Sequence, residues 1–428
     1  MMRFWGEEKK RYAKTKAFWQ GKVTMLHFGI LGEKLSHSYS PMIHRLLGDY
    51  AYDVFEKSPD EVGTFLRSGS FDGFNVTIPY KKTVYEQMDV VSDAAKEIGS
   101  VNTVVRMADG RLFGDNTDVY GFRRMVEKIG VSLSGKKVLV LGSGGASVAV
   151  QYVLRQLQAR TVVISRKGPD NYGNLQKHAD AFAIVNTTPL GMYPKNGENP
   201  VNLADFPACR LVLDLIYNPA RTALLLQAEE LGIPYENGLY MLIAQAKRAS
   251  ELFTETSIAD SEIDRIYGIM RRDLQNIILI GMPGCGKSTV AKKLGELTGR
   301  PVLDTDEEFT KRYNKSPEEV IRSDGEETFR RMETEVLRET ASRSGVILST
   351  GGGVVTREEN YPLLHQNGVI IWLKRDTECL ETAHRPLSQA VGTAELYRER
   401  EPLYEAFSDY ALQVTEHTAE EIVSFLRK

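Results

Sequence analysis

Short apolar runs alternate with stretches of mixed polar and apolar residues along most of this chain. The runs are rich in Val, Ile and Leu, and they predict buried strands that are separated by helices. This alternation is typical of an α/β protein whose strands pair mostly in parallel. The clearest predicted strands are 25–31, 74–78, 138–141, 161–164, 183–185, 211–215, 277–280, 302–306 and 348–350. In addition, 101–106 and 111–113 flank Asp109-Gly110 and predict a β-hairpin.

A glycine-rich turn follows the apolar run Ile277–Ile280 and leads into an amphipathic stretch. From Gly281 to Ser288 it reads G-x-x-x-x-G-K-S, which is the spacing of a phosphate-binding loop. The glycines let backbone N–H groups curl around a polyphosphate, and the following helix adds further N–H groups and a positive dipole end. Lys287 supplies a charge for the β- and γ-phosphates, and the Ser288 hydroxyl can ligate Mg²⁺. The segment therefore predicts a nucleoside triphosphate site.

A second glycine-rich turn, Gly142–Ser147, follows the apolar run Val138–Leu141 and precedes a predicted helix. Strand, glycine turn and helix in this order predict a dinucleotide-binding site. The next strand ends in Ser165–Lys167, where no Asp or Glu is present to accept from a ribose 2′-hydroxyl. A serine and two cations there favour a 2′-phosphate, and hence NADP(H) over NAD(H), although a solvated basic turn is the alternative. The segment 166–183 is short for a complete crossover, so we expect a stunted helix there.

Net charge and cysteine usage narrow the class of protein. The formal net charge of −3 gives no reason to expect a nucleic acid or an anionic membrane as a partner. Cys209, Cys285 and Cys379 form neither a metal-binding spacing nor a disulfide framework, so we expect a reducing, cytoplasmic setting. No apolar stretch is long enough to span a bilayer, and residues 1–24 lack the apolar centre of a signal peptide.

Four motifs in the first part of the chain make the prediction more specific. SHSYSP begins at residue 36, NVTIPYK at 75, SVNT at 100 and GDNTD at 114. Together these motifs resemble the shikimate dehydrogenase family. The resemblance implies that Ser38 and Ser40 hold the carboxylate of the substrate. From the residues alone, Ser40 is also a plausible N-cap for the helix that Pro41 would begin.

The same resemblance implies a catalytic pair, Lys81 and Asp118, beside the oxygen at C3 of the substrate. Thr77, Asn102 and Asp118 would hold ring hydroxyls. Hydride delivery to a ketone builds negative charge on its oxygen, and a nearby ammonium group can stabilise that charge and supply a proton. The carboxylate would orient the ammonium group. Which member of the pair gives the proton stays open at this stage.

The resemblance also covers the dinucleotide-binding part, where the family carries GxGGAS as this chain does. The residues that it places near NADP(H) are Gly142, Ser143, Gly144, Gly145, Ala146, Ser165, Arg166, Lys167, Asn186, Thr187, Ile216, Gly238 and Met241. Tyr217 and Gln245 would contact the substrate. A helix that begins near Gly238 would return to the first domain, so the substrate lobe would be discontinuous.

Residues 275–428 resemble shikimate kinase. Val302–Asp306 is predicted to be a strand that ends in two carboxylates pointing the same way, and such oxygens suit a hard cation or a sugar-like hydroxyl. The resemblance implies that Asp304 acts on Mg²⁺, through water, together with Ser288, and that Asp306 holds and helps deprotonate the attacking hydroxyl. It assigns the substrate to Asp306, Arg330, Gly352 and Arg400, and ATP to Gly284, Cys285, Gly286, Lys287, Ser288, Thr289 and Arg385. Arginine suits a carboxylate because its planar fork binds both oxygens.

One segment departs from the kinase pattern. Asp376–Val391, the expected lid, is shorter than is usual in the family and carries Glu381 where a basic residue is common. This departure affects the expected rate and ATP affinity more than the type of reaction.

We therefore expect an α/β chain in which a discontinuous substrate lobe and a Rossmann NADP-binding domain precede a P-loop kinase domain like that of nucleoside-monophosphate kinases. The predicted parts are an N-terminal arm (1–24), the substrate lobe (25–125 and 237–256), the Rossmann domain (126–236), a linker helix (257–274) and the kinase domain (275–428). The predicted reactions are NADPH-dependent reduction of 3-dehydroshikimate and ATP-dependent phosphorylation of shikimate to shikimate 3-phosphate.

Two alternatives stay open. The first half could act on quinate or with NAD(H). The chain could instead be a ligand-sensing regulator built from inactive enzyme domains, but such a sensor has no need to retain Lys81, Asp118, Lys287, Asp304 and Asp306.

Overall fold

The structure, a computed structural model, describes residues 26–35, 38–376, 378, 380 and 392–426. It confirms the predicted α/β class, with three sheets in which parallel pairing predominates. The chain forms two compact units, Met1–Leu175 with Tyr240–Ile266 and Gln176–Leu239 with Tyr267–Lys428. Within the described ranges, no helix is both long enough and apolar enough to cross a bilayer.

The first sheet has six strands in the order β2-β1-β3-β5-β6-β4. Its strands are β1 (His27–Gly32), β2 (Ala51–Glu56), β3 (Gly73–Val76), β4 (Val90–Val91), β5 (Thr103–Arg106) and β6 (Leu112–Asp115). The connecting helices are α2 (Ser40–Leu47), α3 (Pro59–Arg67), α4 (Lys81–Tyr85), α5 (Asp93–Ile98) and α6 (Asp118–Ile129). The predicted hairpin is confirmed, since β5 and β6 pair antiparallel with Val104 opposite Gly114.

The predicted cap of α2 is wrong by one residue. The helix begins at Ser40 itself, its N-cap is Tyr39, and Pro41 follows within the first turn. Pro41 has no backbone N–H to be satisfied there, which suits it to this turn. The Ser38 hydroxyl accepts a long hydrogen bond from the backbone N–H of Ser40 at 3.3 Å. Ser38, which precedes the helix, therefore satisfies one of the N–H groups of its first turn.

Helix α9 (Leu239–Thr254) carries an aromatic side chain back to the first sheet. The ring of Phe253 stacks on Phe28 of β1 with centroids 4.6 Å apart. Gly121 of α6 lies so close to this helix that an added Cβ would be 2.6 Å from the backbone oxygen of Met241. These contacts fix the side of α9 that faces β1 and α6.

The second sheet has five strands in the order β11-β10-β9-β7-β8. Its strands are β7 (Lys137–Leu141), β8 (Arg160–Ile164), β9 (Ala183–Asn186), β10 (Leu211–Asp214) and β11 (Tyr235–Glu236). The helices between its strands are α7 (Gly145–Gln156), η2 (Leu175–His178), η3 (Leu203–Asp205) and α8 (Ala223–Glu230), while α10 (Ser261–Leu274) follows α9 and precedes the third sheet. The predicted stunted helix is the four-residue 3-10 helix η2, because the short segment leaves no room for a full crossover helix.

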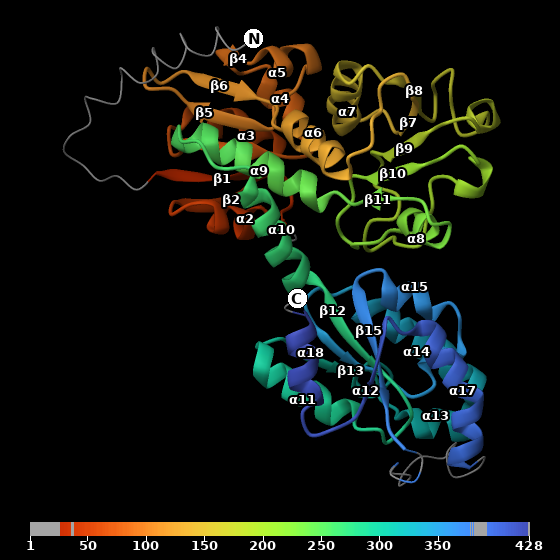
Figure 1. Ribbon diagram of the computed structural model, residues 1–428. Helices are drawn as coiled ribbons and strands as arrows, with labels where there is room; N and C mark the ends of the chain where they lie inside the picture. The colour runs from red at the N-terminus through yellow and green to blue at the C-terminus, as the bar shows by residue number, and fades with distance from the viewer. Residues whose placement is uncertain (1–25, 36–37, 377, 379, 381–391, 427–428) are drawn as a thin grey trace. The chain divides into compact units, whose positions relative to one another are not determined.

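The third sheet is parallel throughout, in the order β13-β14-β12-β15-β16. Its strands are β12 (Asn276–Ile280), β13 (Val302–Asp304), β14 (Ile347–Ser349), β15 (Gly368–Lys374) and β16 (Tyr410–Gln413). The helices are α11 (Lys287–Thr298), α12 (Thr305–Tyr313), α13 (Pro317–Asp324), α14 (Glu326–Thr340), η4 (Val354–Thr356), α15 (Asn360–His365), α17 (Thr393–Phe407) and α18 (Thr418–Leu426). Figure 1 shows α11 and α18 on one side of these strands and α14, α15 and α17 on the other.

Parallel pairing brings the carboxyl ends of β12, β13 and β14 to one edge of the third sheet. All five residues of β12 are buried, as expected of a central strand covered on both faces. The predicted phosphate loop follows β12 and the triple glycine follows β14, while Asp304 ends β13 and Asp306 lies in the helix directly after it. In open parallel sheets, ligands bind at this edge.

Candidate active sites

Lys81 and Asp118 meet as an ion pair in the first unit. Each is the first residue of a helix, Lys81 of α4 and Asp118 of α6. Lys81 Nζ donates to Asp118 Oδ2 at 2.6 Å, and the two side chains are 20% and 5% exposed. The ammonium group is therefore the more accessible member, while the carboxylate beneath it is held in place. This arrangement suits an ammonium group that meets a substrate oxygen.

Asn102 joins this pair to the returning helix. Its side-chain amide donates to Asp118 Oδ1 at 2.9 Å and to Gln245 Oε1 of α9 at 2.8 Å. The structure thus brings together four predicted residues, one from each of four separate segments. Sequence reasoning gave no role to Thr117, whose backbone N–H donates to Asn102 Oδ1 at 2.7 Å.

The other predicted substrate residues of this unit lie at the start of α2 and after β3. Ser38 is half-buried and Ser40 is buried. Thr77 is half-buried, and its backbone N–H donates to the oxygen of Leu31 at 3.0 Å. Among the described residues, no hydrogen bond joins these three side chains to Lys81 or to Asp118. Their predicted contacts with a carboxylate and a ring hydroxyl thus stay predictions.

The turn between β7 and α7 has the shape that a pyrophosphate requires. Gly142 has φ of 101°, a value that favours glycine, and its N–H donates to the oxygen of Ile164 at 2.8 Å. A Cβ built at Gly144 or Gly145 would meet open space, so the turn is free on its outer side. The buried Ser147 hydroxyl donates to the oxygen of Gly142 at 2.7 Å and so ties the turn to the helix.

The remaining predicted cofactor residues of the first unit fall into three places. Ser143 and Ala146 belong to the same turn and helix start, and Ser143 is exposed. Ser165 follows β8, and its N–H donates to the oxygen of Asp170 at 3.2 Å. Arg166 and Lys167 are exposed directly after it. Met241 is buried in α9.

In the second unit, a buried aspartate that sequence reasoning missed organises two predicted cofactor residues. Asp214 Oδ1 accepts from Asn186 Nδ2 and from the backbone N–H of Ile216, each at 3.0 Å, and Oδ2 accepts from Thr222 Oγ1 at 2.7 Å. Burial raises the pKa of Asp214 to about 7, while these three donors oppose the rise. The position of Asp214 at the end of a predicted strand was the feature of the sequence that could have identified it.

Gly238, Thr187 and Tyr217 complete the predicted set in this unit. The N–H of Gly238 donates to the oxygen of Ile216 at 3.0 Å, and a Cβ at Gly238 would overlap the backbone of Leu215. Only glycine fits this close approach of two backbones. Thr187 and Tyr217 are half-buried in the loops after β9 and β10.

The predicted phosphate loop closes around the Lys287 side chain. Gly281, Gly284 and Gly286 have φ of 145°, 84° and 103°. Lys287 Nζ donates to the backbone oxygens of Gly281 and Met282 at 2.8 and 2.9 Å. Positive φ at three glycines lets the backbone curl in the way that a phosphate nest requires.

The neighbouring residues of the loop differ in exposure. Cys285 is buried, so it contributes its backbone to the loop and not a reactive thiol. Ser288 and Thr289 are exposed at the start of α11.

Ser288 and Asp304 fit a magnesium ion. The Ser288 hydroxyl donates to Asp304 Oδ2 at 2.9 Å, which sets two hard oxygen donors side by side. Mg²⁺ keeps several waters and commonly takes only one or two protein ligands plus phosphate oxygens. The described residues contain no cluster of three or more His, Cys, Asp or Glu that could hold a metal.

Asp306 does not lie on the strand, so the predicted pair of carboxylates on one strand is wrong. Asp304 ends β13, and its Oδ1 accepts from the backbone N–H of Asp306 at 3.0 Å. The Asp304 side chain thereby caps α12, and Asp306 lies in the first turn of that helix. An aspartate before a helical segment favours this cap over a longer strand.

The surroundings of the Asp306 carboxyl raise its pKa above the ordinary value for an aspartate. Desolvation, followed by the charges of Asp304 and Glu333, raises its pKa to about 6, and Lys287 and Arg330 oppose the rise. The residue is nevertheless exposed, so solvent reaches part of it although protein atoms lie close to the carboxyl. Since solvent still reaches the carboxyl, its desolvation is only partial, and the two neighbouring carboxylates account for part of the raised pKa. A carboxyl tuned in this way suits a general base.

Arg330 is buried and is held by two carboxylates of its own helix. Its Nη1 donates to Glu333 Oε2 at 2.8 Å, and its Nη2 donates to Glu326 Oε1 at 3.0 Å. Glu333 Oε1 has no hydrogen-bond partner among the described residues. Sequence reasoning assigned no role to either glutamate, although their spacings of three and four residues from Arg330 place them on its face of the helix.

Arg400 meets Gly352, as the predicted substrate site requires. Arg400 Nη1 donates to the backbone oxygen of Gly352 at 3.1 Å, and the Tyr404 hydroxyl donates to the same oxygen at 2.5 Å. A Cβ at Gly352 would lie 2.6 Å from the ring of Pro283. Two side chains from α17 thus fix the backbone of the glycine loop. Arg385 and most of the predicted lid, including Glu381, lie outside the described residues.

Replacing Gly353 by alanine is expected to weaken binding of the kinase substrate. A Cβ there would overlap the Arg330 guanidinium, which Glu326 and Glu333 hold in place. Loss of a charge-assisted contact predicts a rise in KM for shikimate of about 10- to 100-fold. Steady-state kinetics with varied shikimate measure it, and Gly268→Ala, where an added Cβ meets open space, is the matched control. An unchanged KM in Gly353→Ala would contradict the assignment of Arg330.

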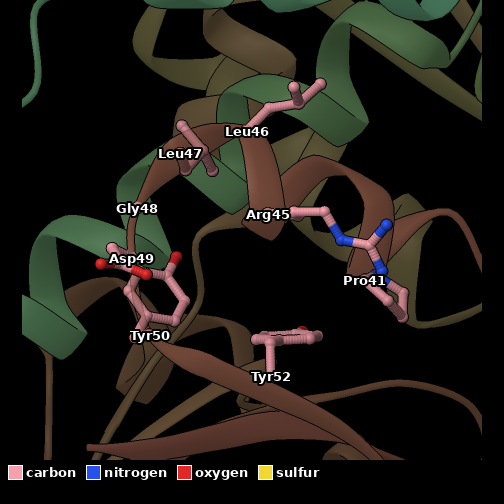
Figure 2. A pocket seen from close by; sticks show the side chains of 8 residues that line it. All are labelled: Pro41, Arg45, Leu46, Leu47, Gly48, Asp49, Tyr50 and Tyr52. Carbon is pink, nitrogen blue, oxygen red and sulfur yellow. The ribbon is translucent and has the colours of Figure 1, made fainter.

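A separate cavity of about 430 Å³ opens over the end of α2 (Figure 2). It is lined by Pro41, Arg45, Leu46, Leu47, Gly48, Asp49, Tyr50 and Tyr52. None of the predicted site residues lines it. The cavity therefore lies outside the catalytic arrangement described above.

Comparisons with known proteins cover both parts of the chain. A model of the shikimate kinase family matches residues 283–428, and a model of the shikimate dehydrogenase substrate binding domain matches residues 30–104. The shikimate dehydrogenase (NADP(+)) of Clostridium perfringens (strain SM101 / Type A) is 35% identical over 262 residues, which cover 56% of this chain and 96% of that protein.

Solved structures give the same match. The crystal structure of a chorismate mutase/shikimate 5-dehydrogenase fusion protein from Clostridium acetobutylicum superposes with a TM-score of 0.55 at 35% identity, covering 58% of this chain and 98% of that one. Shikimate 5-dehydrogenase from Thermus thermophilus in complex with NADP(H) and shikimate gives a TM-score of 0.52 at 31% identity, covering 57% and 98%. Both predicted resemblances are thereby confirmed.

Proposed function

Because the chain belongs to the shikimate dehydrogenase family and also carries a shikimate kinase domain, we propose that it catalyses two consecutive reactions. The first is the NADPH-dependent reduction of 3-dehydroshikimate to shikimate. The second is the ATP-dependent phosphorylation of shikimate at its 3-hydroxyl. The proposal rests on one observation: a single chain retains the reacting groups of both steps, and the product of the first step is the substrate of the second.

In the first reaction Lys81 is the proton donor. NADPH, when bound, supplies the hydride to the carbonyl carbon. As the C=O π electrons move to oxygen, the Lys81 ammonium group stabilises the developing charge and transfers one proton to that oxygen. Asp118, held by Asn102, keeps the amine oriented and favours its reprotonation from solvent. The larger exposure of Lys81 supports its role as the member that meets the substrate.

In the second reaction Asp306 accepts the proton of the 3-hydroxyl as its oxygen attacks the γ-phosphorus of ATP. The bond from that phosphorus to the β,γ-bridging oxygen breaks, and ADP leaves with the electron pair. Lys287 neutralises charge on the transferred group, and Mg²⁺, when bound by Ser288 and the Asp304 shell, adds to that neutralisation. Arg330 and Arg400 hold the substrate carboxylate, so catalysis is chiefly positioning and charge stabilisation.

Preference for NADP(H) rests on the turn after β8. Arg166 and Lys167 are exposed there, and no carboxylate stands at the strand end to bind a ribose 2′-hydroxyl. Arg166→Ala combined with Lys167→Ala should therefore raise KM for NADPH much more than KM for NADH. Faster turnover of quinate with NAD(H) than of shikimate with NADP(H) would favour the alternative substrate and cofactor.

The rate of the kinase step should fall as the pH is lowered through about 6. A raised carboxyl pKa means that the Asp306 proton persists to higher pH, and the protonated form cannot accept the hydroxyl proton. Below about pH 6, kcat/KM for shikimate should fall about tenfold per pH unit, with a plateau above about pH 7. The profile is measured at saturating ATP and Mg²⁺, and an acidic limb centred below pH 5 would contradict this role.

A coupled assay tests the proposed function directly. The protein is supplied with 3-dehydroshikimate, NADPH, ATP and Mg²⁺, and products are followed by NADPH absorbance and by mass spectrometry. Consumption of NADPH together with formation of shikimate 3-phosphate is expected. Omission of ATP should stop the sequence at shikimate. Binding of all ligands without turnover would instead support the sensor alternative.

A further inference from the structure

We propose that Thr103 is a positioning residue that fixes the orientation of the Asn102 amide in the dehydrogenase site. This inference rests on the proposed dehydrogenase function and gives a role to the last residue of the SVNT motif, to which neither the resemblance nor the comparisons assign one. Thr103 is the first residue of β5 and is fully buried. Its hydroxyl donates to Asn102 Oδ1 at 3.1 Å.

An asparagine amide presents different chemistry at its two ends, so its orientation matters. The NH₂ end of Asn102 faces two acceptors, the carboxylate of Asp118 and the side-chain oxygen of Gln245. The oxygen end faces donors, which are the Thr117 N–H, the Thr117 hydroxyl and the Thr103 hydroxyl. A rotation of 180° would set oxygen against oxygen at one end and donor against donor at the other.

Two neighbours bear on the direction of the Thr103 hydroxyl. Asn75 Nδ2 donates to Thr103 Oγ1 at 3.2 Å, so the Thr103 oxygen is an acceptor on that side and its proton is available for another partner. Thr117 Oγ1 lies 3.1 Å from Thr103 Oγ1 and is the second possible partner, but both hydroxyls lie 3.1 Å from Asn102 Oδ1, the common acceptor to which each can donate. Asn75 is oriented in turn, because its Oδ1 accepts from the Tyr52 hydroxyl at 2.7 Å. A directed chain of donors therefore runs from Tyr52 through Asn75 and Thr103 to Asn102.

Burial makes this orientation effective. As whole residues, Asn102 and Asp118 are each 3% exposed, so water cannot readily replace a missing partner. The amide proton given to Asp118 Oδ1 leaves Oδ2 to Lys81 and keeps the carboxylate from turning. Without the Thr103 hydroxyl, Asn102 would lose one of the donors that hold its oxygen, and both its contact to substrate and its contact to Asp118 would loosen.

Thr103→Val tests this role, because it removes the hydroxyl and keeps the shape. We expect kcat/KM for 3-dehydroshikimate to fall about tenfold, as for loss of one buried hydrogen bond. KM for 3-dehydroshikimate should rise while KM for NADPH stays unchanged, whereas partial unfolding would lower the amount of active enzyme without changing either KM. Thr103→Ser should restore most of the activity.

Thr161→Val is the matched control, since the Thr161 hydroxyl has no partner among the described residues and lies on β8.

Affinity for shikimate is measured in parallel by calorimetry, with every protein carrying Arg400→Ala so that the kinase site does not contribute. A wild-type affinity and kcat/KM in Thr103→Val, or a Thr103→Ser variant as impaired as Thr103→Val, would overturn the inference. If Thr103→Val melts at a much lower temperature than the unmodified protein, the inference is decided by whether Thr103→Ser keeps the affinity and kcat/KM of the unmodified protein. Absence of turnover in the unmodified protein would defeat the proposed function alone, because the affinity comparison still tests Thr103.

Discussion

Lys81→Met is expected to lower kcat for reduction of 3-dehydroshikimate by about 10³-fold, within the range that a positioned proton donor contributes. The substitution removes the ammonium group that pairs with Asp118 and keeps most of the aliphatic stem. The developing oxyanion then loses both its charge partner and its proton source. NADPH consumption by the purified full chain measures the effect, and phosphorylation of added shikimate by the same sample should be unchanged.

The neighbouring lysine provides the control for this experiment. Lys82 is exposed on α4, and Lys82→Met changes the same charge one residue away. It should keep the rate of reduction. Equal losses in the two variants would assign the effect to the charge of the helix, and a fully active Lys81→Met would remove Lys81 from the reaction.

Lys287→Met should lower the rate of phosphoryl transfer by about 10²- to 10³-fold, as for removal of one preorganised charge at a reacting group. The Lys287 side chain lies inside the loop formed by Gly281–Gly286, where no other described lysine or arginine donates to the loop oxygens. The γ-phosphoryl group would therefore lose one of the positive charges proposed to neutralise it. ADP formation with shikimate as acceptor measures the effect, and reduction of 3-dehydroshikimate should be unchanged.

Lys292→Met is the corresponding control, because Lys292 is exposed on the same helix α11. It should keep the rate of ADP formation. A Lys287→Met variant with normal turnover would show that the glycine loop binds nucleotide without this charge, and would contradict the proposed kinase mechanism.

The residues that could be predicted from the sequence are those whose neighbours along the chain determine their surroundings. The phosphate loop around Lys287 and the turn at Gly142 follow from local glycine spacing between a strand and a helix. Contacts between segments that are far apart in the sequence could be predicted only from the family resemblance. The ion pair of Lys81 with Asp118 is of that kind, since no local rule relates two residues from separate helix starts.

The features that escaped prediction depend on competition between local structures or on packing in space. Asp306 lies in a helix because the Asp304 side chain caps it, whereas alternation along the strand predicts otherwise. Asp214 organises Asn186 through a contact between neighbouring strands. The Thr103 hydroxyl is next to Asn102 in the sequence, but its partner Asn75 comes from the neighbouring strand β3. The geometry of hydrogen bonds in a folded core cannot be predicted from the order of residue types along the chain.

Lys81, Asp118, Lys287 and Asp306 all lie in the first turn of a helix. Helix ends fray at a lower free energy than the whole domain unfolds, because few contacts are lost when one turn opens. On warming, the four reacting groups would lose their alignment while the sheets and their buried cores persist. Loss of activity is then a more sensitive measure of heat damage in this protein than loss of its secondary structure.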